Sequence, residues 1–143
     1  MDVRSLLPDD APALLPLVRG LAAHHGDVAG ATAETLARDL ADGWFWGFGA
    51  SDPLVGYALV MRHARAQDGA RGVDLHHLHI AAEARRQGVA RALVAAVEAD
   101  ARARGCDYVV IGANVGNVEA RDAYLALGYE WREPTLWRFR KAL

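Results

Sequence analysis

Residues 73–113 hold a strand-like run, a helical run and a second strand-like run, and this order constrains the fold more than any other feature. The first run, VDLHHLHI, ends at Ile80. Apolar residues then recur at helical spacing from Val89 until Gly105, and the apolar run CDYVVIGA that follows is typical of a strand buried on both faces. This order predicts two parallel strands joined by a right-handed helical crossover.

The alternation of apolar residues within VDLHHLHI changes phase part-way along the strand. Val73 and Leu75 follow a period of two, whereas Leu78 and Ile80 fall on the opposite phase. An extra residue in one strand of an antiparallel pair produces such a change. The sequence therefore predicts a β-bulge between Leu75 and Leu78.

The start of the chain predicts a short edge strand and then a helix. Residues 3–7 alternate as an edge strand does, Asp9 and Asp10 stand where a helix cap is expected, and Gly26 closes the segment. Pro16 has no N–H for a bond to the preceding turn. A helix that starts later than the caps suggest is therefore predicted.

A second helix and a hairpin follow. Thr32 is placed to cap a helix that ends at Gly43. The runs WFWGFGA and LVGYALVMR are rich in strand formers, and SDP between them supplies turn residues. These runs predict an antiparallel hairpin, and the polar stretch ARAQDGARG after it predicts a loop.

The last residues predict one more helix and two short strands. NVEARDAYLALGY has a helix cap at Asn117 and a stop at Gly128, and EWREPTLWRFRKAL predicts two strands around Pro134. Antiparallel strands thus come first, and parallel strands with helices come second. This order predicts a mixed α/β (α+β) fold around one mixed sheet.

Length and composition favour one soluble domain spanning residues 1–143. The chain is 52% hydrophobic and 24% charged, with a formal net charge of −2. No single-sign field is available to attract nucleic acid or a membrane surface, so neither partner is predicted. The sequence shows no signal-peptide pattern and no apolar run near the roughly 20 residues of a membrane span, so a cytoplasmic location is expected. The single cysteine, Cys106, has no internal disulfide partner.

The segment ARRQGVAR, residues 84–91, joins the first strand-like run to the helical run. A helix that begins after such a turn leaves backbone N–H groups without partners, and Gly88 and Ala90 let a ligand approach the backbone closely. The cationic side chains here are Arg85, Arg86 and Arg91. A pyrophosphate would fit this turn, but a solvated basic helix start has the same composition. The turn alone does not decide between the two.

A second motif decides the question, because it follows the first in order. The first pattern, Q/R-x-x-G-x-G/A, is matched by Arg85, Gly88 and Ala90. The second, N-x-x-A-x-x-x-Y-x-x-x-G-[FY], is matched by Asn117, Ala120, Tyr124, Gly128 and Tyr129. With one helix and one strand between them, the motifs strongly resemble the GNAT superfamily of acyl-CoA N-acyltransferases. The runs LLPLVRGLAAHH and VDLHHLHI more faintly resemble its diamine and thialysine N-acetyltransferase branch.

The resemblance implies a fold and an activity. The expected fold is a mostly antiparallel central sheet splayed between two parallel strands, with helices on both faces. The expected activity is the transfer of an acetyl group from acetyl-CoA to a primary amine of a small molecule, directly in a ternary complex and without a metal. A homodimer is compatible with the family. An acyl-CoA-binding or sensing module without turnover, or a protein or peptide N-acetyltransferase, are the alternatives.

The resemblance also implies which residues bind acetyl-CoA. The pantetheine is expected where the strands HHLHI and CDYVVIGA splay apart, and the pyrophosphate at the turn. The cofactor-binding residues would be Leu78, His79, Ile80, Arg85, Arg86, Gln87, Gly88, Val89, Ala90, Arg91, Asn117 and Tyr124. The side chains of Leu78 and Ile80 belong to the core in this interpretation, so their backbone N–H groups would bind.

Asn117 and Tyr124 are seven residues apart, two helical turns, and therefore share one helix face. By resemblance, Tyr124 is the general acid that protonates the departing sulfur. A tyrosine at a helix–core boundary with its hydroxyl in water is the alternative. Asn117 is expected both to cap the helix and to contact the pantetheine.

The general base is expected among the histidines, because imidazole titrates near neutrality. His76 stands where several relatives carry a glutamate or histidine implicated as the base, and it is the predicted catalytic base. Asp74 would lie on the same strand face as His76 if no bulge intervened. His77 and His79 share a strand face but supply only two ligands, so no metal site is predicted.

The acceptor pocket is the least specific part of the sequence. Five residues are predicted to bind the acceptor: His24, His25, Trp44, Asp74 and His77. Aromatic residues in such positions also occur in cores and subunit interfaces. His76 and His77 replace an acidic pair of the diamine branch, which favours a small primary amine or an amino-acid-like acceptor over a long polycation.

Overall fold

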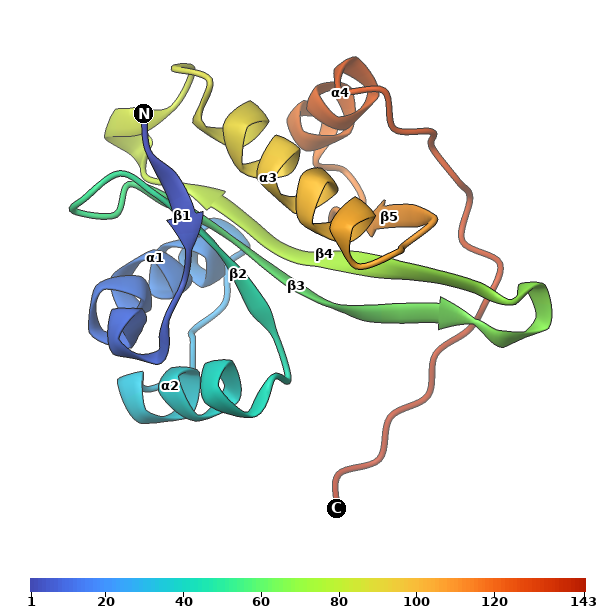
Figure 1. The fold of residues 1–143 in the computed structure, drawn as a ribbon, viewed down its shortest axis with the longest axis horizontal. Helices are drawn as coiled ribbons and strands as arrows, with labels where there is room; N and C mark the ends of the chain where they lie inside the picture. Colours follow the sequence, from blue (N-terminus) through green and yellow to red (C-terminus); the bar gives the residue numbers. More distant parts are fainter. The chain divides into compact units, whose positions relative to one another are not determined.

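The computed structural model describes residues 1–143, which divide into two compact units, Met1–Gly112 and Ala113–Leu143. The first unit holds a five-stranded sheet in the order β1-β2-β3-β4-β5 (Figure 1). Its strands are β1 Val3–Ser5, β2 Trp46–Ala50, β3 Gly56–Arg65, β4 Ala70–Ile80 and β5 Tyr108–Ile111. Its α-helices are α1 Ala11–His24, α2 Ala33–Asp42 and α3 Val89–Ala103. Its short 3-10 helices are η1 Pro8–Asp10, η2 Ala66–Asp68 and η3 Ala82–Ala84.

The strand directions confirm the predicted mixed sheet. Neighbouring strands run antiparallel from β1 to β4, whereas β4 and β5 run parallel with α3 between them in sequence. The predicted edge strand, hairpin and strand–helix–strand unit are all present. The fold is the mixed α+β arrangement expected from the resemblance.

The parallel strands separate after a short ladder. β5 pairs with Gly72–Leu75 of β4, and β4 then continues to Ile80 paired only with β3. Beyond Leu75, the edge of β4 on the β5 side therefore has no strand partner. Backbone N–H and C=O groups on such an edge are available to a ligand.

Helices cover both faces of this sheet (Figure 1). α1 and α2 pack on one face, where Leu14 and Leu36 form a core with Tyr57 and Leu59 of β3. α3 packs on the other face and buries Leu93 among other apolar side chains. The apolar spacing of each helix thus meets a different side of the sheet.

The predicted bulge is present, and His76 is its extra residue. Leu59 lies opposite His77 and the next residue, Val60, lies opposite Leu75, so His76 has no partner in β3. Side chains alternate along a strand, so one inserted residue moves the rest of the strand to the other face. Leu75 therefore faces α3, whereas His77 faces α1.

The prediction that Pro16 would delay the first helix was wrong. α1 begins at Ala11, directly after Asp10, and contains Pro16 in its interior. An interior proline removes one backbone hydrogen bond and its ring crowds the carbonyl four residues earlier, which costs about 3 kcal/mol. Pro16 itself is exposed on the helix surface. The buried neighbours Leu14 and Leu17 hold the helix against the core despite that loss.

The caps of the second helix were predicted correctly. The Thr32 hydroxyl accepts a hydrogen bond from the Thr35 N–H at 3.2 Å. Gly43 ends α2 in the left-handed region with φ 74°. Both ends are therefore set by local residues, which explains why spacing alone located them.

The polar stretch at residues 64–72 is mostly strand rather than loop. β3 runs to Arg65 and pairs there with Ala70, the first residue of β4, and η2 forms the connection. Gly69 closes the turn with φ 63°. The end of this hairpin is exposed, so its side chains are polar without the alternation that marks a half-buried strand.

β5 is less buried than its apolar sequence suggested. Tyr108, Val109 and Ile111 are half-buried, and 37% of the surface of Val110 is exposed. The prediction of a strand buried on both faces was therefore wrong. β5 is the last strand of the sheet and has a ladder partner on one side only.

The second unit contains one helix, α4 Val118–Ala126. Asn117 caps it, and Gly128 follows it in the left-handed region with φ 92°, as predicted. The two strands predicted around Pro134 are absent, because residues 129–143 form no helix or strand. Their own unit offers no strand with which to pair, and an isolated strand is not stable in water.

No helix of the chain combines the length and the apolar character that a membrane crossing requires.

Candidate acyl-CoA and acceptor site

The turn before α3 has the backbone geometry of an anion site. Arg86 and Gly88 adopt positive φ values of 62° and 80°. Gly88 caps α3 without a side chain, and the first helical bond of this cap runs from the Ala92 N–H to the Gly88 carbonyl. The N–H groups at the start of α3 before Ala92 consequently have no intrahelical partner, and the helix dipole adds positive charge there.

Two side chains of the turn hydrogen-bond to nearby backbone carbonyls, and two other cationic side chains of the segment form no ion pair. The Arg85 Nε donates to the Ile80 carbonyl at 3.2 Å, and the Gln87 Nε2 donates to the Glu83 carbonyl at 3.2 Å. Arg86 and Arg91 are exposed and form no ion pair. The turn is therefore held in shape by Arg85 and Gln87 while the other two guanidinium groups face solvent.

Gly56 allows α3 to start close to the end of β4. A Cβ atom at Gly56 would lie 2.8 Å from Ile80 Cδ1 and 3.1 Å from Val89 Cγ1. The Val89 side chain is only 4% exposed and belongs to the core. Val89 can therefore contribute to a ligand site only through its backbone.

The unpaired edge of β4 leads to this turn. Leu78 and Ile80 are only half-buried and are not among the buried core residues, where their side chains were expected. His79 is only 9% exposed, and a Cβ atom at Gly20 of α1 would lie 3.0 Å from its Nε2. The imidazole of His79 is thus packed against α1, so this residue too could meet an acyl-CoA through its backbone alone.

His77 is held by a residue that the sequence analysis did not single out. The fully buried Tyr57 places its hydroxyl 3.0 Å from His77 Nδ1, and its ring centroid lies 6.4 Å from that of His79. His79 lies opposite Tyr57 in the β3–β4 register. The only signal in the sequence was a polar aromatic residue within an otherwise apolar strand, because the register was not known.

Burial keeps both histidines of the α1 face neutral. Desolvation, reinforced by the charges of His76, His25 and His79, lowers the pKa of His77 to about 4. Desolvation and then the Arg85 charge lower the pKa of His79. Burial also raises the pKa of Tyr57, so its hydroxyl keeps its proton.

His76 combines exposure with a fixed neighbour. Its ring stacks on that of His77 with centroids 4.4 Å apart and planes 23° apart, and its side chain is exposed. The bulge at His76 removes the condition under which Asp74 was expected on the same face as His76. By register, Asp74 lies opposite Met61 and comes before the bulge along β4. His77, which faces α1, comes after the bulge.

The end of α1 brings two further predicted residues to the same place. His24 and His25 are exposed, with ring centroids 5.8 Å apart. The charge of His25 acts on both His77 and His79, and that of His24 acts on His79. Trp44 is 73% exposed after α2 and takes part in none of the ring contacts of these histidines.

The second predicted motif lies on α4. The Asn117 side chain accepts a hydrogen bond from the Ala120 N–H at 3.1 Å, which confirms its capping role. Tyr124 lies two turns further along the same helix, and burial raises its pKa. The phenol therefore keeps its proton at neutral pH, as a proton donor must, and the raised pKa makes it a weaker acid than a free tyrosine.

Comparison with known families covers both motifs. The sequence pattern of the acetyltransferase (GNAT) family matches residues 14–129. The chain belongs to this family. The matched range of this GNAT protein includes the turn before α3 and the whole of α4, the two segments that carried the resemblance.

A curated relative shares part of its length with this GNAT protein. N-acetyltransferase 8B of Rattus norvegicus is 30% identical over 118 residues, which cover 80% of this chain and 52% of that protein. The chain therefore spans about half the length of that relative.

Solved structures share the fold. An aminoglycoside acetyltransferase from an uncultured soil metagenomic sample, in complex with sisomicin, matches with a TM-score of 0.83 and 18% identity over 99% of this chain and 96% of that chain. Ribosomal-protein-alanine N-acetyltransferase from Brucella melitensis biovar Abortus 2308 matches with a TM-score of 0.77 and 23% identity over 97% of this chain and 100% of that chain. An aminoglycoside N-acetyltransferase in complex with CoA matches with a TM-score of 0.79 and 20% identity over 99% of this chain and 100% of that chain. At these identities, the similarity shows that the GNAT fold is shared.

Proposed function

We propose that this chain is an acetyl-CoA-dependent N-acetyltransferase that moves an acetyl group to a primary amine of a small molecule by direct transfer in a ternary complex. The turn at residues 85–88 carries the proposal, because its two positive-φ residues and the free N–H groups that follow form an anion site. The turn lies at the end of the unpaired β4 edge. A phosphate-bearing ligand with an amide chain matches both features, and CoA is such a ligand.

The donor set of this chain fits that ligand. When bound, acetyl-CoA supplies the acetyl group as a thioester. We assign the pyrophosphate to the turn and to the start of α3, and the pantetheine to the β4 backbone. Asn117 is assigned to the pantetheine from the motif to which it belongs. The residues so assigned are Leu78, His79, Ile80, Arg85, Arg86, Gln87, Gly88, Val89, Ala90, Arg91 and Asn117.

The proposed proton transfers use one base and one acid. His76 accepts a proton from the acceptor ammonium, directly or through water, and the neutral amine then attacks the thioester carbonyl. Tyr124 donates its proton to the sulfur as the carbon–sulfur bond breaks. In becoming an amide the ammonium loses two protons, one to His76 before the attack and one from the attacking nitrogen as the carbon–sulfur bond breaks. Tyr124 supplies one proton to the thiol, solvent restores both side chains, and one proton is released overall.

The exposure of His76 and its stacking on a neutral His77 support His76 as the base. The neutral His77 ring adds no repelling charge when His76 is protonated. A water molecule or another residue in the base role is the alternative. Two of the structural neighbours described above are aminoglycoside acetyltransferases, which supports a small-molecule acceptor.

Two other functions remain candidates. The ribosomal-protein-alanine N-acetyltransferase among the neighbours favours a protein or peptide acceptor. An acyl-CoA-binding or sensing module without turnover would need the turn but not the Tyr124 hydroxyl. The single domain over residues 1–143, the homodimer and the cytoplasmic location stay predictions.

The test is a turnover screen of the purified chain with acetyl-CoA against amines, amino acids and peptides, with release of free thiol and acetylated product both measured. We expect product with small amines. Acetylation confined to peptides would replace the small-molecule proposal, and acetyl-CoA binding with no product in any class would leave the sensing module.

A further inference from the structure

The His77 ring lies between a buried tyrosine and an exposed histidine. Its Nδ1 lies 3.0 Å from the hydroxyl of Tyr57, which is fully buried. Its face stacks on the exposed His76 ring, with the two centroids 4.4 Å apart. The proposed proton transfers use His76 alone, so they leave His77 without a task.

The Tyr57 hydroxyl donates the hydrogen bond that it shares with His77. A neutral imidazole has one N–H and one nitrogen lone pair, so the proton between the two groups belongs either to the hydroxyl or to Nδ1. Nδ1 is the only polar partner of this hydroxyl. If Nδ1–H were the donor, the hydroxyl proton would remain in the core without an acceptor, which is unfavourable. The hydroxyl therefore donates to Nδ1, and the ring proton of His77 is on Nε2.

The Nε2–H group of His77 is open to solvent. No group of the chain accepts a hydrogen bond from it. His77 is half-buried, yet no fully buried side-chain nitrogen of the structure lacks a hydrogen-bond partner, so solvent reaches Nε2. Burial of the rest of the ring lowers the pKa of His77 to about 4. The N–H is therefore a neutral donor at neutral pH.

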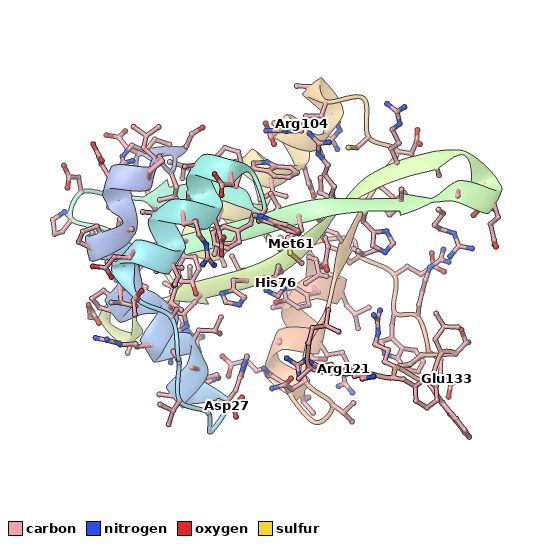
Figure 2. The ribbon with its side chains drawn as sticks, turned by 90° about the horizontal axis from the view of Figure 1, so that it is seen from below. Asp27, Met61, His76, Arg104, Arg121 and Glu133 are labelled. Carbon is pink, nitrogen blue, oxygen red and sulfur yellow. The ribbon has the colours of Figure 1, made fainter.

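A molecule that binds at His76 meets this donor. The planes of the two rings are 23° apart and their centroids 4.4 Å apart. A ligand in contact with the edge of the His76 ring therefore lies beside the edge of the His77 ring. Figure 2 shows His76 at the sheet and apart from Asp27, which follows α1, so that carboxylate does not cover the two rings.

We propose that Tyr57 holds His77 in the Nε2–H tautomer, and that this N–H donates a hydrogen bond to an oxygen atom next to the primary amine of the acceptor. The inference rests on the proposed acetyl transfer and names its substrate class, amines that carry a hydroxyl group on the neighbouring carbon. His77 is then a specificity-determining residue, and Tyr57 is the positioning residue that sets its tautomer.

A neutral N–H donor selects for an oxygen lone pair and not for charge. A methyl group in the same place accepts no hydrogen bond, and a second ammonium group has no lone pair to offer. Solvent reaches Nε2, so water replaces the missing oxygen in part. The preference for the hydroxyl is therefore that of one neutral hydrogen bond, about fivefold in kcat/KM.

The tautomer is measured on the purified full chain without any acceptor. Two-bond proton–nitrogen NMR spectra distinguish a protonated ring nitrogen from an unprotonated one, and we expect His77 to be protonated on Nε2. In Tyr57→Phe the fraction protonated on Nδ1 should rise. Tyr108→Phe is the control, because it removes the contact with His63 and leaves Tyr57 in place. A proton on Nδ1 in the wild type, or an unchanged tautomer in Tyr57→Phe, would overturn the inference.

Two variants separate the ring of His77 from its N–H. Tyr57→Phe combined with His77→Phe keeps an aromatic ring against His76 and removes the N–H together with its buried partner. His77→Gln keeps an N–H donor and removes the ring. For each protein, kcat/KM is measured at saturating acetyl-CoA with ethanolamine and with propylamine, in which a methyl group replaces the hydroxyl. The ratio of the two values should fall about fivefold in the double variant and be largely kept in His77→Gln.

The comparison of ratios cancels the intrinsic reactivity of the two amines. An unchanged ratio in the double variant would overturn the inference while acetyl transfer stands. An equal loss with both amines would place the N–H on the thioester and would overturn it as well, as would acetylation of propylamine but not of ethanolamine. Bound acetyl-CoA without transfer to any amine would instead refute the proposed function, and the substrate class with it.

Discussion

The Tyr57 hydroxyl lies 3.0 Å from Nδ1 of His77 and joins the start of β3 to the part of β4 beyond the bulge. Burial raises the pKa of Tyr57 and lowers the pKa of His77 to about 4, so both partners are neutral at pH 7. The bond therefore fixes one ring nitrogen of His77, and His76 stacks on that fixed ring. Tyr57 thus acts on the proposed base through His77 as a positioning residue.

Replacing Tyr57 by Phe leaves His77 Nδ1 buried without this partner. We expect a loss of about 1 kcal/mol in the free energy of unfolding, measured by urea denaturation, together with a lower kcat at unchanged KM for acetyl-CoA. Tyr108→Phe is the matched control, because it breaks the 2.6 Å contact of Tyr108 with His63 near the other end of β4. Equal losses of kcat in both variants would mean that Tyr57 has only a structural role.

The half-buried His77 makes stability depend on pH in a defined direction. Its pKa is about 4 in the folded chain and about 6.5 in the unfolded chain. As the pH falls, the unfolded chain therefore binds this proton at a higher pH than the folded chain does. Stability from the neutral ring is complete above pH 6.5 and is lost as the pH falls from about 6.5 to about 4. In His77→Gln this part of the loss, on the order of 3 kcal/mol, should be absent. Parallel curves of Tm against pH for the two proteins would contradict the pKa shift.

Substitution of Gly88 by Glu should abolish acetyl-CoA binding, because a carboxylate would occupy the anion site and repel the pyrophosphate. Isothermal titration calorimetry of the folded variant measures the effect. Gly69→Glu is the control, since Gly69 also has a positive φ and open space around a new Cβ, so the backbone strain is similar. Wild-type affinity in Gly88→Glu would remove the pyrophosphate from this turn.

Tyr124→Phe should lower kcat by about 100-fold or more and leave the Kd of acetyl-CoA nearly unchanged, because the proton is needed only as the sulfur departs. The side chain keeps its volume, so α4 is expected to stay folded, which circular dichroism can check. A variant that turns over as fast as the wild type would exclude Tyr124 as the acid.

A histidine base acts only when neutral, so kcat/KM should rise with pH through the titration of that base. His76→Gln should lower the rate about 100-fold and remove this inflection. The profile is measured for both proteins on the best small amine from the turnover screen. If the variant keeps the rate and the inflection, the base is a water molecule or another residue.

Local features of the fold could be predicted because each depends on a few neighbouring residues. Thr32 and Gly43 bound α2 through their own hydrogen bond and backbone conformation, and the phase change between Leu75 and Leu78 required a bulge. Pro16 was misjudged for the opposite reason. The cost of its missing hydrogen bond is local, but the packing that outweighs it is not.

The sequence by itself determined the order of the elements, the bulge and the composition of the turn at Gly88, because spacing and residue type settle these. Only the tertiary structure decided that the bulge turns His77 toward Tyr57, and that His24 and His25 act on residues more than 50 positions away. Those contacts depend on strand register and on the packing of α1 against the sheet. The spacing of residues within one segment predicts neither the register nor the helix packing, because both arise when distant segments bury their apolar faces together.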